Sequence, residues 1–181
     1  MNNNFFTKLI YGGGVFFDTI KWVALVCVIL AIVNTFFFSI FFVDGQSMEP
    51  NLHDKEVVFW RKSSVEADRL SRGQIVLVKY PGDPEHKQYV KRVIGLPGET
   101  LEIKESKVFI NGKVTKQEYI PVYFRTEPDG IWMMKENEYF IMGDNRENSS
   151  DSRIFGPVER RFVLGHASAV IFPRFLLVRD M

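Results

Sequence analysis

Residues 107–115 read KVFINGKVT, two strand-like runs joined by Asn111 and Gly112. An Asn-Gly pair suits the positive φ angles of a two-residue hairpin turn, so the stretch predicts an antiparallel hairpin. Similar short runs rich in Val, Ile, Phe and Tyr recur along the chain, separated by turn-forming residues. They read EVVFW, QIVLVKY, YVKRVIG, TLEI, KVFI, EYFIMG and SAVIF. We therefore expect a mainly β fold with an antiparallel sheet.

Polar residues are concentrated around this hairpin, between about 101 and 138, in KESK, KQE and RTEPDG. Such a composition predicts a small β insertion subdomain that lies apart from the more apolar strands.

A long apolar stretch precedes all of these strands. From Trp22 to Val43 the chain carries no charged residue, and as a helix this stretch would be roughly 30 Å long, enough to cross the hydrocarbon core of a bilayer. A core helix should have a polar stripe, and a cleavable signal has an apolar region of only about 7–15 residues. We assign residues 20–43 to an uncleaved transmembrane anchor.

The charges that flank this anchor predict its orientation. The basic residues before the uncharged run from Trp22 to Val43 include Lys8 and Lys21, and the acidic residues soon after it are Asp44, Glu49 and Asp54. The amino end should therefore stay cytoplasmic. Residues 1–19 would be a cytoplasmic lead with little fixed structure, and residues 44–181 an extracytoplasmic β-domain.

Composition narrows the classes of function. The formal net charge of the 181 residues is +1 and no basic block occurs, which gives no reason to expect a nucleic-acid partner. The one cysteine, Cys27, lies in the apolar stretch, so the β-domain cannot hold an internal disulfide. The histidines, His53, His86 and His166, lack the spacing of metal ligands, and we expect no metal or cofactor.

Two polar segments suggest a reactive pair. In DGQSMEPNL, residues 44–52, Ser47 follows Gly45 in a segment typical of a tight loop. In QYVKRVIGLPGE, residues 88–99, Lys91 and Arg92 would point to opposite faces of a strand, so one of them can be directed inward. Two solvated charges are the simpler interpretation, but a buried lysine loses its proton more readily and could then act as a base for the serine.

A third polar segment, GDNRENSSDSR, covers residues 143–153. Its short polar side chains predict an ordered loop closed by an ion pair between Asp151 and Arg153. A hydroxyl of this loop could also orient the amine of Lys91.

Taken jointly, the apolar span and these segments resemble the bacterial type I signal peptidases, also called leader peptidases. The resemblance covers nearly the whole chain, including the serine box SMEP, the strand RGQIVLVKYP at residues 72–81, the lysine box KRVIGLPGE and the box GDNRENSSDSR. It implies that Ser47 is the nucleophile and Lys91 the general base. It further implies that Ser149 orients the lysine, with support from Met48, Asp151 and Arg153.

Three positions depart from the commonest family pattern. Asn51 stands where a threonine often follows the proline of the serine box, and Gln74 stands where an aspartate is frequent. Gly45 replaces a serine that binds the oxyanion in some members, so the oxyanion hole would rely on backbone N–H groups such as that of Ser47.

The resemblance implies endoproteolysis through an acyl-enzyme in the bacterial inner membrane, in a single-pass protein. The implied partners are the lipid bilayer and secretory preproteins whose signal has small residues one and three positions before the cut. Three alternatives stay open: a serine hydrolase with His53 or His166 as base, a related Ser–Lys peptidase such as a pilin peptidase or a self-cleaving repressor, and a tethered β-domain without catalysis. The repressor fits poorly, because a span replaces its DNA-binding helices.

Overall fold

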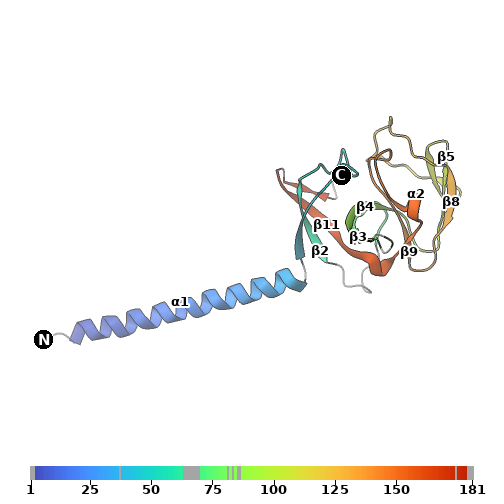
Figure 1. The fold of residues 1–181 in the computed structure, drawn as a ribbon. Helices are drawn as coiled ribbons and strands as arrows, with labels where there is room; N and C mark the ends of the chain where they lie inside the picture. The colour runs from blue at the N-terminus through green and yellow to red at the C-terminus, as the bar shows by residue number, and fades with distance from the viewer. Residues whose placement is uncertain are drawn as a thin grey trace. The chain divides into compact units, whose positions relative to one another are not determined.

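The computed structural model describes residues 3–36, 38–62, 70–80, 82, 84, 87–173 and 175–178. The chain divides into two compact units, Met1–Phe38 and Ser39–Met181, which are described separately (Figure 1).

The first unit consists of helix α1, Asn3–Phe36. The expectation that residues 1–19 have little fixed structure is wrong, because the helix begins at Asn3. Three consecutive glycines in this region each cost only about 1 kcal/mol relative to alanine, and a long helix gains one backbone hydrogen bond for every residue added.

The apolar stretch is not a single helix. The predicted anchor at residues 20–43 extends past the end of α1 at Phe36, and Phe38–Phe42 forms strand β1 at the edge of a sheet beside β2, Val57–Lys62. The sequence of β1, FSIFF, is rich in aromatic and β-branched residues that favour a strand, and pairing with β2 satisfies the backbone groups on one side of it. No helix in the described part of the chain is long and apolar enough to cross a membrane.

The second unit is built on an eight-stranded sheet in the order β1-β2-β11-β3-β4-β9-β10, with β12 paired to β11. The pairs from β2 to β10 are antiparallel, as expected. The bounds of the further strands are β3 Ile75–Lys79, β4 Gln88–Gly95, β9 Glu138–Met142, β10 Val158–Glu159, β11 Val163–Phe172 and β12 Leu176–Leu177. Two short helices, α2 (Ser152–Phe155) and η1 (Arg160–Phe162), follow β9.

A second sheet of four strands has the order β7-β6-β5-β8. Its strands are β5 Thr100–Lys104, β6 Lys107–Ile110, β7 Lys113–Val114 and β8 Gly130–Met133. The predicted hairpin is confirmed, since Asn111 and Gly112 have φ angles of 48° and 76° between the antiparallel strands β6 and β7. These strands fall almost entirely within the range expected for the insertion, and in Figure 1 β5 and β8 lie at the opposite end of the unit from β2 and β11.

Each strand expected from the sequence is present, whereas β1, β8, β10 and β12 were not foreseen. The last two contain only two residues each, too few to leave a pattern in the sequence.

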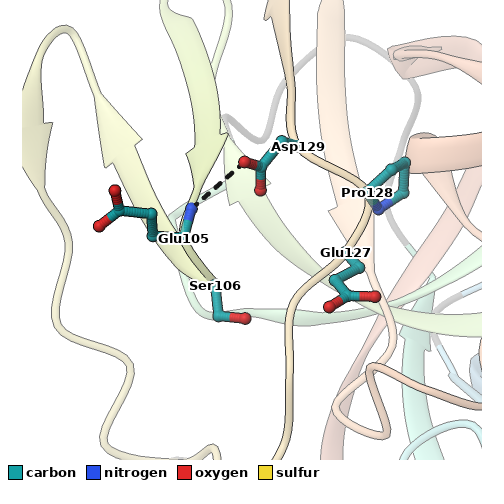
Figure 2. Close-up of a pocket in the computed structure, with 5 residues that line it drawn as sticks. All are labelled: Glu105, Ser106, Glu127, Pro128 and Asp129. Carbon is teal, nitrogen blue, oxygen red and sulfur yellow. Dashed lines mark hydrogen bonds between the residues drawn. The ribbon is translucent and has the colours of Figure 1, made fainter.

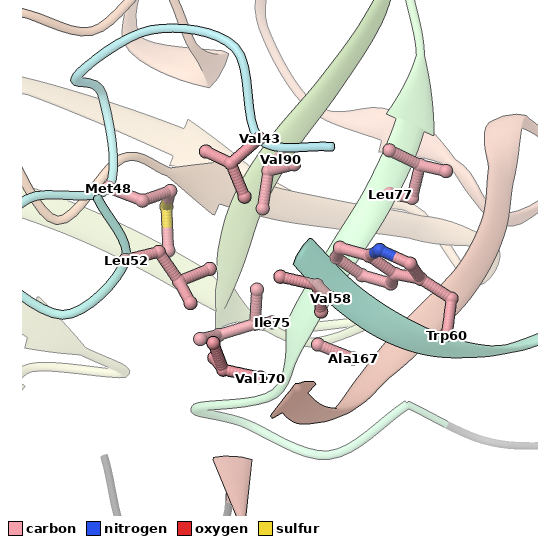
Figure 3. Packing of buried hydrophobic residues seen from close by; sticks show 10 residues of the cluster. All are labelled: Val43, Met48, Leu52, Val58, Trp60, Ile75, Leu77, Val90, Ala167 and Val170. Carbon is pink, nitrogen blue, oxygen red and sulfur yellow. The ribbon is translucent and has the colours of Figure 1, made fainter. Parts of the chain in front are cut away.

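The core of the large sheet is completed by the segment that follows β1. Ten buried hydrophobic residues pack together there, and three of them, Val43, Met48 and Leu52, come from that segment rather than from a strand (Figure 3). A second cluster, which includes Ile94 and Phe140, packs β4 and β9 against Leu101 and Ile103 of the small sheet. The segment that carries Ser47 is anchored in the core of the large sheet through Val43, Met48 and Leu52.

Candidate active site

Ser47 lies on a loop that apolar side chains hold from beneath. Met48 and Leu52 are fully buried among the strands of the large sheet (Figure 3), and the backbone N–H of Leu52 donates to the carbonyl of Met48 at 2.9 Å. Gly45 has φ +99°, a left-handed conformation that favours glycine. Ser47, unlike Met48, is only half-buried, and it lines an open groove.

Lys91 comes from the middle of β4 and meets the Ser47 hydroxyl. Its Nζ lies 2.7 Å from Ser47 Oγ, although the two residues are 44 positions apart in the chain. Lys91 is only 2% exposed, and its Nζ lies 5.7 Å from the centroid of the Tyr89 ring. The predicted inward lysine is thus present, and it is in hydrogen-bond contact with the predicted serine.

Burial changes the ionisation of Lys91. Desolvation lowers the pKa of its amine from 10.5 to about 8, against the opposing charges of Asp151 and Asp144, and Arg153 lowers it further. Removing an ammonium group from water disfavours its charged form, because the protein interior solvates it less well. A neutral amine is therefore available near neutral pH, and it can accept the proton of a hydroxyl 2.7 Å away.

The third polar segment forms the opposite wall of the site. The Asp151 carboxylate accepts two hydrogen bonds from the Arg153 guanidinium, both at 2.8 Å, and a third from Gly143 N at 2.9 Å. Burial alone would raise the pKa of Asp151, but the bonds and charge of Arg153 and the bond from Gly143 hold it below its ordinary value. The predicted ion pair is confirmed, and Asp151 also caps helix α2.

Gly143 lies where this segment meets the serine loop. A Cβ atom there would come within 2.5 Å of the Ser47 carbonyl oxygen and would also collide with the Ser149 side chain. Ser149 Oγ is buried; it makes no hydrogen bond of normal geometry to a described residue, but it interacts with the Asp151 carboxylate and helps to lower the pKa of that group. Ser149 is therefore brought to the site, but the structure contains no hydrogen bond between it and Lys91, and its orienting role stays a prediction.

Both cations on β4, Lys91 and Arg92, are buried, whereas the sequence led us to expect only one of them to be directed inward. Arg92 is also 2% exposed, because its face of the strand is covered by the loop after β9. Its Nε and one terminal nitrogen donate to the two oxygens of Asp144 at 2.8 and 2.6 Å, and Asn51 Nδ2 donates to the same carboxylate at 2.8 Å. Asn51, a departure from the family pattern, thus helps to hold the second buried ion pair.

Asn145 and Arg146 were also missed by the sequence analysis. The backbone N–H of Asn145 donates to the Ser47 carbonyl at 3.1 Å, which ties the serine loop to the opposite wall. Arg146 is buried and donates to the Gly143 carbonyl, to Thr126 Oγ1 and to Gln117 Oε1. Five charged residues within eleven positions of one loop were the only available signal, and they do not indicate which side chains are buried.

An open groove of about 490 Å³ gives access to the pair, and its lining includes Gly45, Ser47, Tyr89, Lys91 and Ser150. Neither of the described histidines lines this groove. His53 lies elsewhere on the serine loop and His166 in β11, opposite Arg61 and Val76, whereas His86 lies outside the described residues. A serine and histidine pair is therefore not assembled at Ser47.

A second pocket lies at the small sheet and carries three carboxylates, from Glu105, Glu127 and Asp129. Figure 2 shows that they point in different directions, and Asp129 accepts a long bond from the Glu105 N–H at 3.4 Å. Within the described ranges, no group of three His, Cys, Asp or Glu side chains could hold a metal ion.

Several known proteins are similar in sequence to this chain. Residues 16–172 match the family model described as "Signal peptidase, peptidase S26". The chain is 37% identical over 166 residues to a signal peptidase I from Bacillus amyloliquefaciens, which covers 86% of this chain and 88% of that protein. It is 35% identical over 164 residues to signal peptidase I S from Bacillus subtilis (strain 168), with coverage of 84% and 87%.

A solved structure of a signal peptidase I from Enterococcus faecalis V583 is 29% identical in sequence. The match covers 56% of this chain and 98% of that one, with a TM-score of 0.48.

Proposed function

Since this chain belongs to the S26 family of signal peptidases and is a serine peptidase, we propose that it cleaves signal peptides with Ser47 as nucleophile and Lys91 as general base. The observation that supports this assignment is the 2.7 Å contact between Ser47 Oγ and the Nζ of a buried lysine whose pKa is about 8.

The proposed reaction has two stages. Neutral Lys91 takes the proton of the Ser47 hydroxyl as Oγ attacks the scissile carbonyl carbon, and the Lys91 ammonium then protonates the leaving amine as the C–N bond breaks. The product is an ester between Ser47 and the signal peptide. Water, deprotonated by Lys91, attacks this ester, and Ser47 regains its proton when the acyl group leaves as a carboxylate.

The surrounding residues are assigned supporting roles. Ser149 orients the amine of Lys91, a role that the family resemblance implies and that its buried position beside Asp151 allows. Asp151 and Arg153 fix the loop that carries Ser149, and Met48 anchors the nucleophile in the core. The Ser47 N–H, from which no described residue accepts a hydrogen bond, is the proposed oxyanion donor.

The proposed substrates are secretory preproteins with small residues one and three positions before the cut. The groove that Ser47 and Lys91 line is open to solvent, so an extended peptide can reach the pair. We further assign membrane association to α1, because large apolar side chains from Phe16 to Ile32 are exposed along it. The flanking charges favour a cytoplasmic amino end and an extracytoplasmic β-domain.

Cleavage of a preprotein by the full chain in detergent tests the dyad. Ser47→Ala and Lys91→Ala should each abolish release of the mature protein, while Lys79→Ala, at the exposed end of β3, should cleave at the normal rate. Mass spectrometry of rapidly quenched reactions should find the acyl group on Ser47. Cleavage that survives Lys91→Ala but is lost in His53→Ala or His166→Ala would disprove the assignment.

A further inference from the structure

The loop that carries Ser47 is closed at its base by a short set of hydrogen bonds. Val43 N donates to the Glu56 carbonyl and Lys55 N donates to the Val43 carbonyl, both at 2.8 Å. Two residues further along from Val43, Gly45 N donates to Asp54 Oδ1, also at 2.8 Å. The last of these bonds is the one nearest to the nucleophile, and it depends on a side chain.

Gly45 controls the direction in which the chain enters the site. Its φ of +99° reverses the backbone two residues before Ser47, and a Cβ atom at this position would meet nothing within 4 Å. Glycine is therefore required by the backbone angle and not by lack of space. Because Gly45 is exposed, packing does not hold this angle; the bond to Asp54 restrains the Gly45 peptide directly, and a 2.6 Å ion pair between Asp44 and Lys55 crosses the loop beside it.

The two sides of the turn are restrained by different groups. Beyond Gly45, Asn145 donates its side-chain amide to the Gln46 carbonyl at 3.2 Å and its backbone N–H to the Ser47 carbonyl at 3.1 Å. These bonds fix the peptides that follow the turn, whereas Asp54 fixes the peptide that precedes it. The peptides on both sides of the turn that leads to Ser47 are therefore held by hydrogen bonds.

We propose that Asp54 is a positioning residue for the cleavage reaction: by accepting the Gly45 N–H, its carboxylate holds the turn that presents Ser47 to Lys91 and to the substrate carbonyl. This inference rests on the proposed function of Ser47 and Lys91. The acceptor is required, and the negative charge is not, because a backbone N–H needs only an oxygen lone pair.

The ionisation of Asp54 agrees with this role. The bond from Gly45 is the largest cause that lowers the pKa of its carboxyl, and the ammonium of Lys55, 3.5 Å away, lowers it further. Asp54 is thus a carboxylate throughout the pH range in which Lys91 titrates. Removing it should therefore change the rate at every pH without moving the midpoint of the pH profile.

The test compares Asp54→Ala, Asp54→Asn and Glu49→Ala in preprotein cleavage by the full chain. Asp54→Ala should lower kcat about tenfold, the effect of one hydrogen bond to a charged group, with little change in KM. Asp54→Asn retains an acceptor oxygen and should cleave within about twofold of the unchanged chain. Glu49→Ala removes another carboxylate of the same loop and should have no effect on kcat.

A second variant perturbs the same turn independently. Gly45→Ala adds a methyl group that meets no neighbour, so its effect comes from the φ angle alone, and it should also lower kcat at unchanged KM. The thermal unfolding midpoints of the Asp54 variants are measured in parallel, to confirm that they remain folded.

Three results would overturn the inference: an unchanged kcat in Asp54→Ala, an equal loss in Asp54→Asn, or a shifted pH midpoint in Asp54→Ala. An equal loss in Asp54→Asn would show that the negative charge of Asp54 matters rather than its acceptor oxygen. A shifted pH midpoint would show that Asp54 acts on the ionisation of Lys91. Ser47→Ala in the same assay separates the two proposals. If Ser47→Ala still cleaves, the proposed function fails whatever the Asp54 variants do.

Discussion

The ionisation of Lys91 predicts how cleavage depends on pH. Only the neutral amine can take the proton of Ser47, so kcat/KM should rise about tenfold per pH unit below a midpoint near 8 and level off above it. The sign follows from burial: desolvation lowers the pKa of the amine, which moves the active, neutral form to lower pH.

The structure sets the magnitude of this effect. At pH 7, a pKa of about 8 leaves about one amine in ten neutral. The unshifted value of 10.5 would leave about one in 3,000 neutral. Burial therefore makes the base about 300-fold more available at neutral pH, which corresponds to roughly 3 kcal/mol.

The assay measures kcat/KM with a signal-bearing peptide in detergent between about pH 5.5 and pH 10, the range that separates a histidine from an unshifted lysine. A midpoint near 6.5 would instead identify a histidine as the base, and a rate that still rises at pH 10 would identify a solvated lysine. Either result would refute the reasoning from burial. Lys91→Arg serves as a control, because a guanidinium stays protonated throughout this range and should be inactive.

Three further predictions concern the residues around this pair. Lys91→Met should be inactive but up to about 3 kcal/mol more stable in denaturant unfolding below pH 8, because burying the ammonium costs stability there, and the difference should fade between pH 8 and 10.5. Gly143→Ala should abolish cleavage by displacing the Ser47 carbonyl, while circular dichroism shows the fold retained. Asp144→Ala should lower the free energy of unfolding by about 3–5 kcal/mol, since it leaves Arg92 buried without its carboxylate, and an unchanged denaturation midpoint would contradict this.

The sequence predicted most of the strands because their signals are local. The alternation of KVFINGKVT and its Asn-Gly turn specify a hairpin through residues that are neighbours in the chain. The apolar stretch was harder to divide, because an uncharged run suits both a helix and a strand. Its last residues are extended in β1 because they lie beside β2, and β2 begins fifteen positions after β1 ends.

The sequence by itself determined which chemical groups are available: a serine on a glycine-containing loop, a lysine within an apolar strand, and a loop closed by Asp151 and Arg153. Only the tertiary structure decided that Lys91 and Arg92 are both buried and that Lys91 reaches Ser47. Strand alternation assigns neighbouring side chains to opposite faces, but whether a face is dry depends on what covers it. Here the covering segments are the serine loop and the loop after β9, which come from distant parts of the chain, so the lowered pKa of Lys91 is a property of the folded structure.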